Sequence, residues 1–194
     1  MSTTTRWTSA DLESLPDDGT RYEIIDGELY MSKQPHSYHQ FVCSEVHGVL
    51  RDWNRTANLG AVVFAPGLIF ADDDDVVPDV VWISNDRLNE SLKSDGKFHE
   101  APELVIEVLS PGRVNERRDR EAKLKLYSRR GVGEYWIISW KTRSVDVYRR
   151  DKTELKLVSN LEERDRLQSP LLQGFSCSVA SLFALIPTGE DRES

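Results

Sequence analysis

Runs of consecutive apolar residues mark the predicted buried strands of this chain. One run occupies residues 104–109, where Glu107 is the single polar position, and Pro102 and Pro111 bound it. A second, largely apolar run occupies residues 134–140. Continuous apolar runs of this length are typical of strands that are covered on both faces of a sheet. We therefore predict two buried strands at these positions.

An amphipathic helix is predicted between the two strands, over residues 114–130, and Gly131 is well placed to cap its C-terminus. A projection at about 100° per residue gives this helix one inward face. The apolar residues of that face are Ala122, Leu126 and Tyr127. The opposite face carries Arg117, Glu121, Lys125 and Ser128. Asp119 and Lys123 fall within the apolar sector, so Lys123 is expected to point inward.

Shorter runs predict the remaining elements. Asp26-Gly27, between apolar-rich runs on either side, predicts a β-hairpin near the N-terminus. A second principal helix is predicted from His39 to about Trp53. Further strands are expected at 62–70 with a bend at Pro66-Gly67, and at 76–83, 144–148 and 154–159. Apolar segments at 171–175 and 179–185 are expected to close the core.

These elements predict an α+β or α/β fold, with a mixed central sheet flanked by helices and an N-terminal hairpin. The whole chain, 1–194, is expected to form one domain, with residues 1–18 as an N-terminal extension and residues 187–194 as a frayed tail. The acidic run 72–75 lacks the glycine and the distal glutamate of a calcium loop, so we interpret it as a solvated hairpin tip.

The net charge of −8 argues against a general nucleic-acid coat protein. The charge is uneven, however, because residues 113–130 hold eight basic side chains against three acidic ones. A local basic helix fits a confined contact with a polyanion, and it also fits an ordinary solvated helix. The candidates for phosphate contacts are Arg113, Arg117 and Arg118.

The expected location is the cytoplasm. No segment approaches the roughly 20 apolar residues of a membrane span, and the N-terminus has no apolar signal region. Cys43 and Cys177 lie in apolar or small-residue contexts without a partner motif, so they are interpreted as buried thiols in a reducing compartment.

Two charged residues are out of place on structural grounds alone. Glu107 lies in the middle of a predicted buried strand. Desolvation of its carboxylate there costs roughly several kcal/mol, unless a cation or hydrogen-bond donors compensate. Lys123 points inward with Asp119 one turn earlier, which could be a helix-stabilising ion pair. Asp79, on another predicted strand, could join Glu107 in holding a hard divalent cation, and a nearby ammonium could then stabilise charge on a phosphate.

At this point the chain resembles the PD-(D/E)XK nuclease superfamily, and most closely the Uma2 family of restriction-endonuclease-like proteins. The resemblance covers about residues 15–183. It rests on the order of five short motifs: Arg21-Tyr22-Glu23-Ile24-Ile25-Asp26-Gly27-Glu28, Pro78-Asp79-Val80, Glu107-Val108-Leu109-Ser110-Pro111, Asp119, Lys123 and Tyr127 at a spacing of four, and residues 131–136. The implied fold is a restriction-endonuclease-like mixed sheet.

The resemblance also implies site residues. Asp79 and Glu107 would bind Mg²⁺, for which Mn²⁺ may substitute, and the Val108 carbonyl would be a third ligand. The superfamily lysine two positions after Glu107 is absent, because Leu109 stands there. Lys123 matches the place from which the family supplies its lysine, so it becomes the third catalytic candidate. The accessory candidates are Glu23, His39, Asp119 and Tyr127.

Two functions are compared. The leading one is a magnesium-dependent endonuclease that hydrolyses DNA phosphodiester bonds, with Asp79, Glu107 and Lys123 as its catalytic set. The other is a catalytically silent nuclease-fold module that binds nucleic acid or a protein partner, which the acidic net charge favours. DNA is the expected substrate, and no association with a membrane is expected. The sequence does not decide between a monomer and a homodimer.

Overall fold

The computed structural model describes residues 6–32 and 34–187, and its centre is a mixed six-stranded sheet. The order of its strands is β10 (Glu154–Glu162), β9 (Ser144–Asp151), β8 (Glu134–Ser139), β7 (Leu104–Val108), β6 (Val80–Ser84) and β3 (Gly60–Phe64). Only β7 and β8 pair in parallel, since a helical crossover joins them, and the other neighbours pair antiparallel. The two predicted apolar strands are thus the two central ones.

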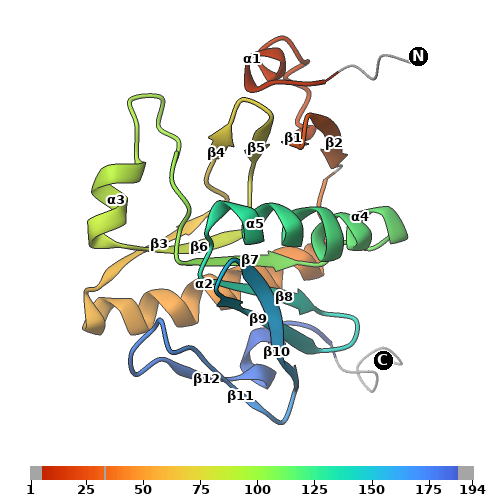
Figure 1. Ribbon diagram of the computed structural model, residues 1–194. Coiled ribbons are helices and arrows are strands. Elements are labelled where there is room, and N and C mark those ends of the chain that lie inside the picture. The colour runs from red at the N-terminus through yellow and green to blue at the C-terminus, as the bar shows by residue number, and fades with distance from the viewer. Residues whose placement is uncertain (1–5, 33, 188–194) are drawn as a thin grey trace.

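Helices cover both faces of this sheet (Figure 1). One face packs against α2 (Ser37–Ala57), and the other against a continuous helical stretch of α4 (Arg113–Arg117), η1 (Arg118–Lys123) and α5 (Leu124–Arg130). The strands alternate between the two cores: Val80 and Trp82 pack on the α2 side, whereas Val81 and Ile83 pack on the α5 side. Both principal helices were predicted, and the predicted fold class is confirmed.

A second, four-stranded antiparallel sheet lies on the α5 side of the molecule (Figure 1). Its strands are β2 (Glu28–Ser32), β1 (Arg21–Ile25), β5 (Asp74–Val76) and β4 (Leu68–Ala71). The predicted hairpin joins β1 to β2, and both turn residues take positive φ, 54° at Asp26 and 74° at Gly27. Two-residue hairpin turns of this kind favour an Asp-Gly pair.

The remaining elements are short. They are α1 (Ser9–Leu12), α3 (Asn85–Ser91), the β11 (Arg166–Gln168) and β12 (Ser176–Ser178) pair, and the 3₁₀ helix η2 (Val179–Phe183). The C-terminal apolar segments close the core over α2, as predicted, through Leu172, Phe175 and Phe183. None of the helices in the described ranges has an apolar stretch of membrane-spanning length. The predicted frayed tail lies, beyond Pro187, outside the described residues.

Two predicted strands are wrong, and the interpretation of the acidic run is right for only half of it. The segment 62–70 forms two strands in different sheets, because the chain turns at Ala65 (φ 47°) and Pro66. The segment 76–83 also divides between the sheets, on either side of Pro78. The acidic run is only partly a solvated tip: Asp72 and Asp73 form the turn between β4 and β5 as predicted, whereas Asp74 and Asp75 lie in β5 and are buried, where Asp74 pairs with Arg129 and Arg130.

Candidate active site

Adjacent central strands bring Asp79 and Glu107 together. Val80 of β6 pairs with Ile106 of β7, so Asp79, immediately before β6, lies opposite Glu107. The Val108 backbone N–H donates to Asp79 Oδ2 over 2.9 Å, which fixes this carboxylate against the end of β7. Both side chains are almost fully buried, with 4% of Asp79 and 2% of Glu107 exposed. The two carboxyl groups that the sequence predicted to act together therefore lie side by side in the protein interior.

Glu107 projects toward the helix that follows its strand. Its Oε1 accepts hydrogen bonds from Lys123 Nζ at 2.8 Å and from the Tyr127 hydroxyl at 2.9 Å. Lys123 is only 1% exposed, and its Nζ also lies 2.9 Å from Glu23 Oε1 but 3.9 Å from Asp119 Oδ1. The closest partners of Lys123 are therefore Glu107 and Glu23. The simple pair with Asp119 that helical spacing suggested is the weakest of its three contacts.

A π-helical segment explains why so many charges on one helix face inward. Residues Arg118–Lys123 form η1, in which hydrogen bonds run from i to i+5, so residues 118, 119 and 123 are all buried. Arg118 donates to Asp119 Oδ1 (3.1 Å) and to Ser32 Oγ (2.6 Å), and lies 3.6 Å from Glu23. The ideal α-helical projection placed Asp119 and Lys123 inward correctly but missed Arg118, because it separates positions i and i+5.

This geometry corrects one part of the predicted phosphate-binding surface. Of the three candidates for phosphate contacts, Arg118 is buried in the charge cluster and not on the helix surface. Arg113 and Arg117 are exposed as expected, and Arg117 pairs with Glu121 on the helix surface. Arg118 therefore lines the active-site cavity described below, and it also borders a second cavity beside Arg117.

A cavity of about 190 Å³ opens onto this cluster. It is lined by both central carboxylates and by residues from the hairpin, α2 and the β7 end: Gly19, Arg21, Ser32, Gln34, Pro35, His39, Gln40, Asp79, Glu107, Val108, Ser110, Arg118 and Asp119. Arg21 is about one third exposed, and its NH1 lies 3.4 Å from Asp79 Oδ1. Arg21 and Arg118 thus present guanidinium groups at the same cavity as the carboxylates.

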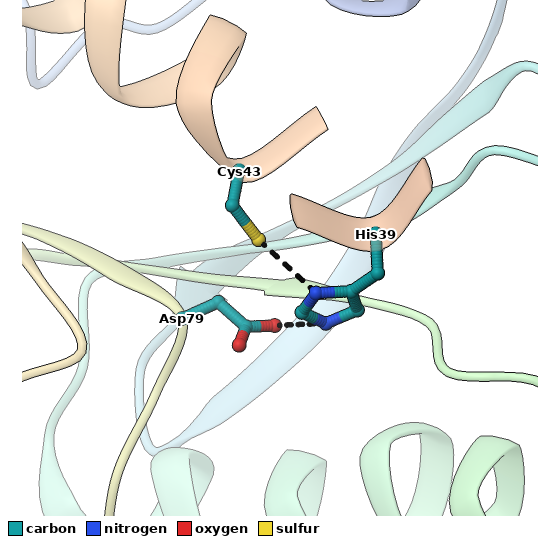
Figure 2. A group of neighbouring side chains, drawn as sticks. All are labelled: His39, Cys43 and Asp79. Carbon is teal, nitrogen blue, oxygen red and sulfur yellow. Dashed lines mark hydrogen bonds and ion pairs between the residues drawn. The ribbon is translucent and has the colours of Figure 1, made fainter. Parts of the chain in front are cut away.

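His39 reaches the site from the opposite face of the sheet (Figure 2). It lies in the first turn of α2, and its Nε2 is 3.1 Å from Asp79 Oδ2. One turn later, Cys43 Sγ lies 3.5 Å from His39 Nδ1. The three side chains are buried and offer ligand atoms within 4.8 Å of one another. Burial, together with the Asp79 and Glu107 carboxylates, raises the pKa of the Cys43 thiol, which is therefore neutral.

The pKa values of the carboxyl groups diverge within this cluster. Burial raises the pKa of Asp79, but the hydrogen bond from His39, the charge of Lys123 and the Val108 N–H outweigh it and lower the value to about 2. Burial also raises the pKa of Glu107, and the neighbouring Asp79 and Asp119 add to this against the opposing charge of Lys123, so its pKa rises to about 8. The pKa of Asp119 is raised too, chiefly by burial.

This divergence follows from a shortage of positive charge. The buried carboxyl groups of the cluster are Glu23, Asp79, Glu107 and Asp119, whereas its buried permanent cations are Lys123 and Arg118. Arg21 adds a partial contribution from the rim. A buried anion without a full complement of cations favours its protonated form. The site is therefore electrostatically suited to a further cation.

Sequence reasoning gave no role to two residues of the site. Arg21 shares a strand face with Glu23 at a spacing of two, and this period was the signal that could have identified it. Cys43 follows His39 by one helical turn, so the spacing that placed Lys123 beside Asp119 would also have placed this thiol beside the imidazole. All four accessory candidates, Glu23, His39, Asp119 and Tyr127, lie within hydrogen-bonding or ion-pairing distance of the predicted set.

Comparison with known proteins identifies the family. The model of the Uma2 family, described as "Putative restriction endonuclease", matches residues 9–180, which is most of the chain. The chain belongs to the Uma2 family. No curated protein sequence matches this Uma2 protein.

The fold of this Uma2 protein is similar to a crystal structure described as "a putative nuclease belonging to DUF820" from Anabaena variabilis. The TM-score is 0.72 at 21% sequence identity, over 91% of this chain and 97% of that one. At this identity the similarity establishes a shared fold. The type IIG restriction endonuclease BpuSI is similar over 76% of this chain and 15% of its own, at 15% identity and a TM-score of 0.40, which is too weak to carry an argument.

Proposed function

We propose that this Uma2 protein is a divalent-metal-dependent endonuclease that hydrolyses DNA phosphodiester bonds. The observation that carries the proposal is the pair of buried carboxylates, Asp79 and Glu107, that face one cavity in a cluster short of positive charge. The description of the Uma2 family as restriction endonucleases supports the same reaction class.

The residues of the cavity fit a divalent cation. Carboxylate and carbonyl oxygens suit both Mg²⁺ and Mn²⁺. Asp79 and Glu107 would hold the ion, with the Val108 carbonyl as a further donor at the same cavity, while His39 orients Asp79. A cation there would also remove the charge deficit that raises the pKa of Glu107. When bound, such an ion polarises a phosphoryl oxygen and lowers the pKa of a coordinated water.

The chain's own side chains would orient the reactants. Lys123 and Tyr127 hold one oxygen of Glu107, and His39 and the Val108 N–H hold one oxygen of Asp79. Glu107 therefore keeps its other oxygen for a ligand, whereas the other oxygen of Asp79 faces Arg21 at 3.4 Å. Arg21 and Arg118 line the cavity and would bind the phosphate oxygens of the substrate, since guanidinium groups match their geometry.

The experiment that tests this proposal measures metal binding and cleavage together. Millimolar Mn²⁺ or Mg²⁺ should raise the melting temperature of the wild type, because a ligand that binds only the folded state stabilises it. Glu107→Gln and Asp79→Asn should abolish this rise and the cleavage of plasmid DNA. Glu134→Gln is the matched control, because Glu134 is a fully buried glutamate of the neighbouring strand β8 outside the cavity.

The control should keep the metal-induced rise even if its basal melting temperature falls. A wild type whose melting temperature is indifferent to both ions would refute the metal site. A wild type that binds the ions through Asp79 and Glu107 but cleaves no nucleic acid would instead favour the silent binding module.

A further inference from the structure

A cluster of aromatic and basic side chains surrounds Trp140, outside the candidate active site. The His36 ring stacks on the Trp140 indole, with centroids 5.1 Å apart and 21° between the planes. Tyr38 meets the same indole edge-on, at 5.4 Å and 82°. Lys141 and Arg143 border the adjoining cavity of about 440 Å³, which Ile186 and Pro187 complete. We call this feature the Trp140 cleft.

Unsatisfied donors gather at the Trp140 cleft. Across residues 6–32 and 34–187, two buried side-chain N–H groups lack a hydrogen-bond partner, namely Trp140 Nε1 and Arg143 Nε. Both belong to residues that line this cleft. Buried donors are satisfied in the great majority of native structures, so two orphans at one place point to a ligand with hydrogen-bond acceptors.

A middle cavity lies between the Trp140 cleft and the candidate active site and shares lining residues with both. Ser32, Gln34, Pro35 and Ser110 line both the catalytic cavity and this middle cavity. His36 lines both that middle cavity and the Trp140 cleft. Residues 36–39 therefore contribute to both places: His36 and Tyr38 contact Trp140 in the cleft, and His39 contacts Asp79 in the candidate active site.

We propose that the Trp140 cleft binds an unpaired nucleotide of the nucleic-acid strand whose phosphodiester enters the active site. This inference rests on the proposed function and names its substrate class. Aromatic rings stack on bases of any sequence, and the two orphan N–H groups belong to residues that line the same cleft. Lys141, half exposed and only loosely paired with Glu116 at 3.8 Å, supplies charge for a phosphate.

The proposal excludes intact duplex from the cleft. A base within a duplex has both faces covered by its neighbours and cannot stack on His36 or Trp140. A single strand, or the frayed or displaced end of a duplex, has a free base to offer. The preferred substrate is therefore nucleic acid with an unpaired segment beside the scissile bond.

Fluorescence anisotropy with a labelled thymidine oligonucleotide, in the presence of a chelator, tests the cleft without metal chemistry. Trp140→Leu removes the platform, and His36→Asn removes the stacking ring while keeping a residue that caps α2 well. Each should weaken binding about fivefold or more, the range for loss of one base stack. Lys141→Ala should reduce the salt slope of the affinity by about 0.7, the value for one single-strand phosphate.

Matched controls lie elsewhere on the surface. His47 meets Phe64 edge-on at 6.4 Å, and Lys156 is as exposed as Lys141 but pairs more closely, with Asp151 at 2.6 Å. His47→Asn and Lys156→Ala should bind the oligonucleotide like the wild type. A duplex made from the same oligonucleotide and its complement should bind the wild type and His36→Asn with equal affinity. If Trp140→Leu fails to fold, His36→Asn and Lys141→Ala still decide.

Equal affinity of the wild type, His36→Asn and Lys141→Ala for the oligonucleotide would overturn the proposal. So would an equal loss for single strand and duplex, since stacking cannot account for it. Failure here leaves the metal-dependent tests of Asp79 and Glu107 untouched. Conversely, cleft-dependent binding by a protein that never cleaves would support the Trp140 cleft and contradict only the proposed nuclease activity.

Discussion

At the scale of single residues, Lys123 determines whether the buried acids can coexist. Its ammonium lies within 4 Å of three carboxyl groups, those of Glu23, Glu107 and Asp119. These attractions outweigh the cost of its burial and raise its pKa above the ordinary value, so it stays charged. The lysine is therefore a structural counter-ion as well as a catalytic candidate, and the two roles require separate measurements.

Replacing Lys123 by methionine should destabilise the protein by about 3–5 kcal/mol, the usual effect of removing one partner from a buried ion pair. Urea unfolding at neutral pH measures this change. Lys125→Met, on the exposed face of the same helix, should change stability by no more than about 0.5 kcal/mol.

The catalytic role of Lys123 is tested by measuring nucleic-acid cleavage by the same two variants, at temperatures well below their unfolding midpoints. Loss of one charge-stabilising donor lowers turnover by roughly two to three orders of magnitude, so Lys123→Met should show such a loss and Lys125→Met should not. Equal cleavage by the two variants would assign Lys123 to stability alone. Equal stability of the two would instead refute the counter-ion role.

At the scale of elements, the edge strand β3 depends on one glycine. Gly60 pairs with Ser84 of β6, and a Cβ added at Gly60 would lie 2.1 Å from the Ile83 carbonyl oxygen. Backbone atoms on the neighbouring strand cannot move aside as a flexible side chain can. The close approach of β3 to β6 therefore requires a residue without a side chain at this position.

Gly60→Ala should consequently cost at least about 1–3 kcal/mol of stability, the range for forced overpacking. Gly48→Ala is the matched control, because Gly48 lies inside α2 with no atom within 4 Å of an added Cβ. There the alanine should stabilise the protein by about 0.5–1 kcal/mol through its helix propensity. Thermal or urea unfolding of both variants checks the opposite signs, and destabilisation by Gly48→Ala as well would contradict this explanation.

At the scale of the whole molecule, buried charges join the smaller sheet to the helix that covers the central sheet. Glu23 of β1 contacts Lys123, and Ser32 of β2 accepts from Arg118. Asp74 of β5 accepts hydrogen bonds from Arg129 and Arg130 at the end of α5. The smaller sheet therefore depends on electrostatic contacts that acid can titrate.

Asp74 predicts a specific acid sensitivity. Burial raises its pKa, but the Asp26 N–H and the Arg129 and Arg130 side chains outweigh this and lower the pKa below its ordinary 3.8. A carboxyl group with a lowered folded pKa stabilises the protein above its unfolded pKa. That contribution is lost as the pH falls through the folded value.

Asp74→Ala should lose about 1–3 kcal/mol at pH 7, the range for hydrogen bonds to charged groups. Its disadvantage relative to the wild type should shrink as the pH falls below about 3.8. Asp73→Ala, which removes an exposed partner of Arg6, should cost about 0–1 kcal/mol. Urea unfolding from pH 7 down to pH 3 measures all three proteins, and a constant disadvantage of Asp74→Ala across that range would contradict the assignment.

The sequence by itself determined the features that depend on local periodicity and on uncompensated polarity. Apolar runs predicted β7 and β8, and Asp26-Gly27 predicted the hairpin. A glutamate in a buried strand had to have a partner, and the inward sector of the helix contained the lysine that contacts it. These inferences succeed because each depends on the burial or the backbone conformation of a short segment, which its own residues determine.

Only the tertiary structure decided the features that depend on which segments meet. A local pattern could not show that Pro66 and Pro78 divide their segments between two sheets, or that Asp74 finds two arginines 55 and 56 residues away. The π-helical turn that buries Arg118 is equally invisible, because its spacing is chosen by the ion pairs that it satisfies. Long-range electrostatics and sheet pairing, rather than local preference, therefore completed the site.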